Sequence, residues 1–75
     1  MYKVVESPVI KLVGEKVRQK RLEKGYSQDQ LAIEADIPKS QVGRIERGEI
    51  NTTIATLDKI SQALGVTIKD LVDIY

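Results

Sequence analysis

Residues 39–47, KSQVGRIER, bring cationic and β-branched side chains together at helical spacing. An α-helix turns by about 100° per residue, so Val42 and Ile45 share one side while Arg44 and Arg47 share the other. A guanidinium group donates hydrogen bonds to phosphate oxygens, and it can donate two at once to the O6 and N7 acceptors of guanine. The segment is therefore typical of a short helix that is anchored by its apolar side and enters a groove of DNA.

Two helices joined by a tight turn are expected around this segment. Ser27 has the side chain of a good N-cap for the earlier helix. That helix stops at Asp36-Ile37-Pro38, because the residue before a proline disfavours the α region. Pro38 then begins the next helix, which ends at Gly48. The two helices and the turn predict a helix-turn-helix unit over residues 27–48.

Three further helices complete an all-α pattern with short connections. Their signals are Pro8 and Gly25 for the first helix, Thr53 and Gly65 for the fourth, and Thr67 with Asp70 at the start of the fifth. These are the residue types that begin and end helices. In the fourth helix, an apolar stripe at i, i+3, i+4 spacing runs from Ile54 to Leu64. We expect one domain over residues 1–75, with residues 1–6 as a flexible arm or a short strand.

Composition excludes several classes of site. The 75 residues contain no cysteine and no histidine, so disulfides, the usual zinc sites and Cys- or Ser-His nucleophile systems are ruled out. Uncharged runs are short: residues 50–57 and 60–68 are the longest, far shorter than the ~20 residues that span a membrane. The carboxylates are dispersed, so neither an enzyme nor a bound cofactor or metal is expected. The sequence predicts a soluble, cytoplasmic protein.

Charge is unevenly distributed along the chain, although the net charge is only +1. Residues 11–24 hold six cations against two anions, while residues 51–75 hold two cations against three anions. A basic segment of this kind suits a polyanionic partner. It is also what an ordinary solvated helix face looks like, so the charge pattern alone does not decide between the two.

Together these features resemble the lambda-repressor/Cro-like helix-turn-helix family, also called the XRE family. The resemblance covers roughly residues 12–72 and rests on RLEKGYSQDQLA, on QVGRIERGE and on TLDKISQALGVTIKDL, all at the family's spacing. It implies a compact all-α domain of five helices in which the second and third form the helix-turn-helix. It also implies that double-stranded DNA is the partner.

The resemblance implies which side chains read the bases. Lys39, Ser40 and Arg44 match the positions from which family members reach base edges, and Gln41 lies at the boundary of that face. Lysine and arginine can donate to guanine, and serine can pair with several bases. The alternative is a solvated cationic face. Gly43 falls on the same outer side, where it would allow close approach to DNA or to the second helix.

A second set of residues would hold the DNA backbone without reading sequence. Gln28 matches the family's glutamine at the start of the second helix, where helix N–H groups can approach a phosphate. Arg47, Asn51 and Thr52 lie where phosphates pass in related complexes. Glu49 fits this surface poorly, because phosphates repel a carboxylate.

Arg21 and Glu46 are expected to have a structural task. In the family, an arginine and a glutamate at these positions pair across the first and third helices. Such a pair orients the third helix and removes Arg21 from the set of phosphate contacts.

The turn departs from the family pattern at two positions. Asp36 stands where glycine is common, at a position that requires positive φ, which aspartate tolerates better than most residues. Pro38 replaces the usual serine or threonine cap, so a side-chain cap is lost while φ is preset. Both changes affect the start of the reading helix, where Lys39 and Ser40 lie.

A homodimer is expected because one copy of so small a domain contacts few base pairs. Family members form two-fold dimers on half-sites about one helical turn apart. The last helix carries Leu71, Ile74 and Tyr75, more apolar surface than a short terminal helix can bury, and we assign the dimer interface to them. Alternatively, Leu71 completes the core and the last residues fray. The N-terminal segment is the rival interface.

The leading hypothesis is a sequence-specific regulator of transcription that acts as a homodimer on a two-fold operator. Small phage regulators and the controller proteins of restriction-modification systems are members of this kind. The alternative is an antitoxin-type module that binds a second small protein and also regulates itself through DNA. It predicts an apolar surface that the homodimer leaves uncovered, including Val4, Val5 and Val9.

Overall fold

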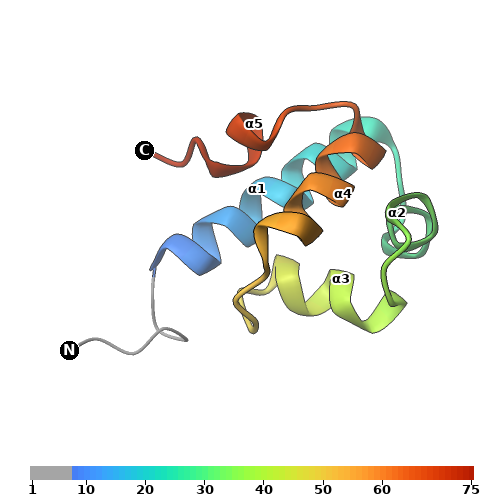
Figure 1. Cartoon of the computed structure of the whole chain (residues 1–75), viewed down its shortest axis with the longest axis horizontal. Coiled ribbons are helices and arrows are strands. Elements are labelled where there is room, and N and C mark those ends of the chain that lie inside the picture. Colours follow the sequence, from blue (N-terminus) through green and yellow to red (C-terminus); the bar gives the residue numbers. More distant parts are fainter. Residues whose placement is uncertain (1–7) are drawn as a thin grey trace.

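The computed structural model describes residues 8–75, and the arm or strand expected at residues 1–6 lies outside that range. Within it the chain forms five helices (Figure 1): α1 (Pro8–Lys24), α2 (Gln28–Ala35), α3 (Lys39–Glu46), α4 (Ile54–Leu64) and α5 (Ile68–Val72). The predicted all-α, five-helix fold is confirmed, and α2, α4 and α5 begin directly after their predicted N-caps, whereas α3 ends at Glu46, before the predicted Gly48. None of the helices in residues 8–75 is both long and apolar enough to cross a membrane.

Local hydrogen bonds explain why α2 begins where it does. The Ser27 hydroxyl accepts from the backbone N–H of Gln30 at 3.1 Å, and the Gln30 side chain accepts from the N–H of Ser27 at 2.9 Å. This reciprocal capping box satisfies two helix N–H groups that have no partner within the helix. The capping signal therefore fixes the N-terminus of α2, the end that faces α3.

The α2–α3 turn has the unusual backbone that its sequence predicts. Asp36 adopts the left-handed conformation with φ 55°, so aspartate occupies the position that favours glycine. The N–H of Ile37 closes the turn on the carbonyl oxygen of Ala32 at 3.1 Å. Pro38 has φ −59° and gives α3 no side-chain cap. Both expected departures are confirmed, and α3 begins with its first N–H groups uncapped.

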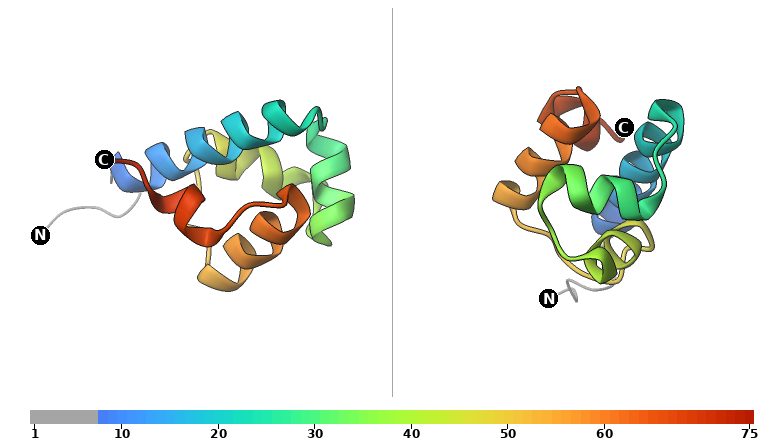
Figure 2. Two further views of the ribbon diagram at one scale, coloured as in Figure 1. Left: turned by 90° about the horizontal axis from the view of Figure 1, so that it is seen from above. Right: turned by 90° about the vertical axis from the view of Figure 1, so that its right-hand side faces the viewer.

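The core lies where all five helices meet. α1 contacts α3, α4 and α5, while α2 packs against α3 and α4 (Figure 2). The largest fully buried side chains of this core are Val17, Leu31, Val42, Ile45, Ile60 and Leu71. Two of these belong to the eight-residue α3. Burying each of the two contributes about 1.5–3 kcal/mol, so apolar burial anchors α3 even though the helix is too short to be stable alone.

Gly14 allows α1 and α3 to approach closely. A Cβ atom at this position would overlap the backbone carbonyl oxygen of Ile45, and it would lie 2.9 Å from that of Glu46. Because backbone atoms cannot move aside as a side-chain end can, only glycine fits here without moving a helix. This residue sets the distance of α3 from the rest of the fold.

The assignment of Leu71 to a dimer interface is wrong for this fold. Leu71 is 0% exposed and belongs to the core cluster, because α5 packs its inner face on α1 and α4. Ile74 is half-buried against the same cluster, while Tyr75 is 91% exposed. Val72, on the last turn of α5, is 43% exposed. The apolar surface that the C-terminal region leaves open therefore consists mainly of Val72 and Tyr75.

Candidate nucleic-acid interface

α3 lies along one edge of the molecule, with its outer side open (the lower edge in Figure 1). Lys39, Ser40 and Arg44 are exposed on it, and Gln41 is half-buried. Opposite them, Val42 and Ile45 are 1% and 2% exposed. The helix thus has the two opposed faces expected from its spacing, and the three predicted base readers share the open face.

Gly43 does not belong to that open face. It is buried, and a Cβ atom there would lie 2.9 Å from Arg47 Nη1 and 3.5 Å from Gln28 Oε1. The Arg47 side chain and the start of α2 cover the position. Of the two approaches considered for this glycine, the structure therefore supports the one to α2.

Arg21 and Glu46 meet in the interior. Arg21 Nε donates to Glu46 Oε2 at 2.7 Å and Nη2 donates to Oε1 at 3.1 Å, while Nη1 donates to the carbonyl oxygen of Tyr26 at 2.8 Å. Arg21 and Glu46 are 7% and 5% exposed. One guanidinium group therefore ties α1, the α1–α2 turn and the end of α3 together, and it cannot reach a phosphate.

Gln28 has a partner within the protein. Its Nε2 donates to Glu46 Oε1 at 3.1 Å, although the residue as a whole is exposed at the first turn of α2. The Glu46 carboxylate thus holds Arg21 and Gln28 together. Because Nε2 carries two hydrogens, the amide can bond Glu46 and still present a donor beside the helix N-terminus.

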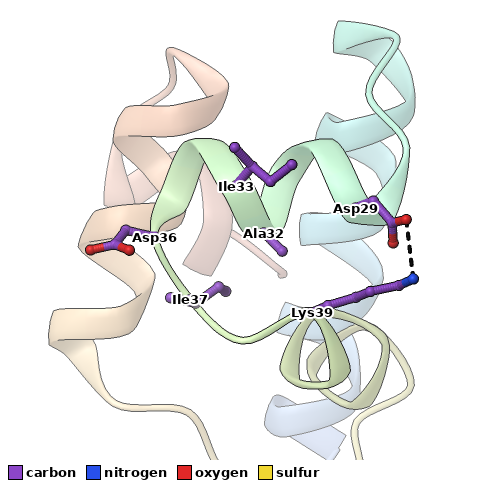
Figure 3. Close-up of a pocket in the computed structure, with 6 residues that line it drawn as sticks. All are labelled: Asp29, Ala32, Ile33, Asp36, Ile37 and Lys39. Carbon is purple, nitrogen blue, oxygen red and sulfur yellow. Dashed lines mark ion pairs between the residues drawn. The ribbon is translucent and has the colours of Figure 1, made fainter.

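Each cation on this surface is paired with a carboxylate. Lys39 Nζ lies 3.2 Å from Asp29 Oδ2, as drawn in Figure 3. Arg47 Nε lies 2.6 Å from Glu49 Oε2, and Arg44 Nε lies 3.9 Å from Glu49 Oε1. The hydrogen bond from Arg47 holds the pKa of Glu49 below its ordinary value, and the same bond raises the pKa of Arg47. Asp29 was not among the predicted site residues, because its pairing depends on how α2 and α3 cross.

The loop after α3 contributes two residues that differ in exposure. Asn51 is exposed, so its side chain can reach a ligand. Thr52 is half-buried, and its hydroxyl oxygen is buried with no hydrogen-bond partner in residues 8–75. The expected phosphate contact through the Thr52 side chain is therefore wrong for this conformation. Thr52 lines a hollow together with Val9, Ile10 and Val13 of α1.

A shallow hollow lies beside the paired Lys39, where α2 meets the turn (Figure 3). Its volume is about 410 Å³, and it is lined by Asp29, Ala32, Ile33, Asp36, Ile37 and Lys39. Ile33 is 76% exposed. In the part of the chain that the structure describes, no group of three or more acidic residues could hold a metal ion.

Gly14 and Asp29 are the residues that sequence reasoning missed. An isolated glycine within a helical pattern often marks close packing, so Gly14 carried a usable signal in the sequence. Asp29 carried none, because an acidic residue in the first turn of a helix is common for electrostatic reasons alone.

A helix-turn-helix with an exposed, polar third helix on a five-helix core defines a class of DNA-binding domain. The helix-turn-helix family model HTH_3 matches residues 17–71, which is more than half of the chain. The chain therefore belongs to the helix-turn-helix family.

The chain shares sequence or structural similarity with known proteins, and three of these are compared with it by identity and coverage. It is 49% identical over 63 residues to the control protein C.BamHI of Bacillus amyloliquefaciens, covering 83% of this chain and 78% of that protein. The crystal structure of the restriction-modification controller protein C.AhdI from Aeromonas hydrophila matches with a TM-score of 0.81 at 32% identity, over 83% of this chain and 94% of that one. The transcriptional regulator SinR of Bacillus subtilis is 40% identical over 63 residues, which are 83% of this chain and 57% of SinR.

Proposed function

We propose that this chain is a sequence-specific, double-stranded DNA-binding regulator of transcription of the controller-protein kind, and not an enzyme. The observation that carries the proposal is the exposed face of α3, where Lys39, Ser40 and Arg44 lie together opposite a buried apolar side. Gln41 joins them at its edge. The similarity to C.BamHI and C.AhdI, two proteins named as controllers, supports the same function. Its place of action is then the cytoplasm, where its DNA target lies.

The proposal assigns backbone contacts to the flanks of this face. Gln28 at the start of α2, Arg47 and Asn51 are exposed, and the side chains of Gln28 and Arg47 both border Gly43 of α3. Contacts of this kind hold the register of a helix in the groove without reading sequence. Two copies, related by a two-fold axis, would read half-sites about 34–36 Å apart. Val72, Ile74 and Tyr75 are the C-terminal residues that we assign to the contact between them.

The test is selection of bound sequences from random duplex DNA by the purified chain. Two symmetric half-sites separated by one helical turn would support a dimer that reads sequence. If bound duplexes at moderate salt were no more alike than the starting pool, sequence-specific binding would be refuted.

A second protein partner is the other candidate, favoured by one observation. SinR is represented among the matching structures by a complex with SinI, which matches this chain with a TM-score of 0.78 at 40% identity over 81% of it. Val9 is 43% exposed and lines an apolar hollow of about 160 Å³ together with Val72. A stable complex with a second small protein in equal amounts, weakened by Val9→Ser, would support this function. A chain that forms only homodimers would contradict it.

A further inference from the structure

Glu49 engages both arginines of the α3 surface at once. Its carboxylate accepts from Arg47 Nε at 2.6 Å and from Nη2 at 3.4 Å, and its Oε1 lies 3.9 Å from Arg44 Nε. The backbone N–H of Glu49 bonds the carbonyl oxygen of Arg44 at 2.9 Å. That bond holds the backbone of Glu49 at the end of α3, so its side chain starts directly beside the surface proposed to meet DNA.

These ion pairs are open to exchange. The side chains of Arg44, Arg47 and Glu49 are 55%, 58% and 48% exposed. Exposed ion pairs contribute little to stability and are easily replaced by other partners. A phosphate or a guanine edge can therefore take either arginine from Glu49. The displaced carboxylate then lies close to the DNA backbone, which repels it.

We propose that Glu49 is a specificity-determining residue that competes with DNA for Arg44 and Arg47. This inference rests on the proposed function, since it assumes that the two arginines contact DNA. On duplexes that offer only phosphates, Glu49 keeps the arginines partly neutralised, and binding through charge alone is weakened. On the operator, a guanine offers Arg44 two aligned acceptors, which a single phosphate contact does not reproduce.

Glu46, the acidic residue within α3, cannot have this role. Glu46 is 5% exposed and holds Arg21 and Gln28. Asp29 faces Lys39 from α2 and does not reach the arginines in this structure. Because Glu46 and Asp29 have other partners, Glu49 is the carboxylate that pairs with both arginines.

The experiment measures the affinity of Glu49→Gln for a selected operator and for a scrambled duplex over a range of salt concentrations. The substitution keeps the shape of the side chain and removes its charge. Each phosphate newly neutralised adds about 0.9 to the slope of log affinity against log salt. We expect affinity for the scrambled duplex to rise by roughly tenfold at low salt, with a slope steeper by about one to two units. Operator affinity should rise less, so the ratio between the two falls.

Two further variants separate competition from a general change in charge. Glu23→Gln removes the same charge from an exposed carboxylate and also breaks an ion pair, with Lys20 at 3.6 Å, but on α1. Glu23→Gln should change the affinity for the operator and for the scrambled duplex slightly and equally. In an Arg44→Ala/Arg47→Ala background, Glu49→Gln should change the DNA affinity little further, because the two arginines that Glu49 pairs with are absent.

Each outcome has one meaning. If Glu49→Gln behaves like Glu23→Gln while the parent still prefers its operator, the inference is wrong and the proposed function stands. If Glu49→Gln instead loses operator affinity and relaxes preference at one base pair, Glu49 reads a base directly and the competition is refuted. If the parent itself shows no preferred sequence, the proposed function fails and the inference fails with it.

Discussion

The Glu46 carboxylate accepts two hydrogen bonds from Arg21, at 2.7 and 3.1 Å, and so joins the end of α3 to α1. The same carboxylate accepts from Gln28 at the start of α2. The two helices of the helix-turn-helix are therefore positioned by one buried group as well as by apolar packing. Orientation of the reading helix and stability of the domain depend on the same contact.

Replacing Glu46 by alanine should damage folding. Removing one partner of a buried pair leaves an uncompensated charge, which costs about 3–5 kcal/mol. That is a large share of the stability of a small domain. Urea unfolding of Glu46→Ala measures the loss directly. A variant that unfolds like the parent and yet fails to bind DNA would show that Glu46 serves recognition instead.

Alanine at Gly14 should destabilise the protein, although alanine is the better helix former. The added methyl group overlaps the Ile45 carbonyl, and overpacking of this kind costs about 1–3 kcal/mol. Gly43→Ala is the matched control, since there the methyl group meets only the ends of the Arg47 and Gln28 side chains. It should gain up to about 1 kcal/mol from helix propensity. Equal effects of the two substitutions on thermal unfolding would contradict the close packing of α1 and α3.

Arg44 and Arg47 should differ in how their loss affects DNA binding. Arg44→Ala should cost about 1–3 kcal/mol and relax preference at one base position. Arg47→Ala should weaken every sequence alike and flatten the salt dependence by about one unit. Titrations on the operator and on single-base variants of it distinguish the two. The assignment is reversed if Arg47 proves to be the residue that changes base preference.

Substitution of Leu71 should affect the stability of the fold, whereas substitution of Tyr75 should affect self-association. Leu71→Ala leaves a cavity in the core and should cost about 2–5 kcal/mol. Tyr75, at 91% exposed, should leave the unfolding midpoint of the monomer unchanged when replaced by alanine. Sedimentation over a range of concentrations should then show a weaker dimer for Tyr75→Ala. If association is unchanged, the interface lies elsewhere, and the N-terminal segment becomes the next region to vary.

Asp70 should make the free energy of unfolding depend on pH. The Asp70 carboxylate accepts from the N–H of Thr67 at 2.9 Å, and this bond holds its pKa below the ordinary value. A lowered pKa in the folded state means that the unfolded chain binds the proton first as pH falls. The contribution of Asp70 is therefore present above about pH 4, its ordinary pKa, and is lost as pH falls through the lowered pKa.

Urea unfolding of Asp70→Asn and of the parent, from about pH 7 to about pH 2, isolates this contribution. The variant should lose less stability on acidification than the parent. Glu49 also has a lowered pKa, but it is present in both proteins, so its effect cancels in the comparison. Parallel curves would show that the reciprocal capping box of Thr67 and Asp70 at the start of α5 does not couple stability to pH.

The local signals in this sequence determined the helices and the face that α3 exposes. Ser27 with Gln30 begins α2, Asp36 and Pro38 shape the turn, and the 100° spacing separates Val42 and Ile45 from Arg44. Such features depend on residues within one or two turns of each other, so the order of residue types is enough to find them.

Apart from the Arg21–Glu46 pair, which the family resemblance implied, the tertiary structure decided which side chains meet across helices. It placed Leu71 in the core, turned the Thr52 hydroxyl inward, buried Gly43 and paired Lys39 with Asp29. Each of these depends on the distance and crossing of two elements that the local sequence does not specify. The packing of backbone on backbone at Gly14 sets part of that geometry. The exposure of Lys39, Ser40 and Arg44 on α3 was thus readable from the sequence, whereas the ion-pair partner of Lys39 followed from how the helices pack.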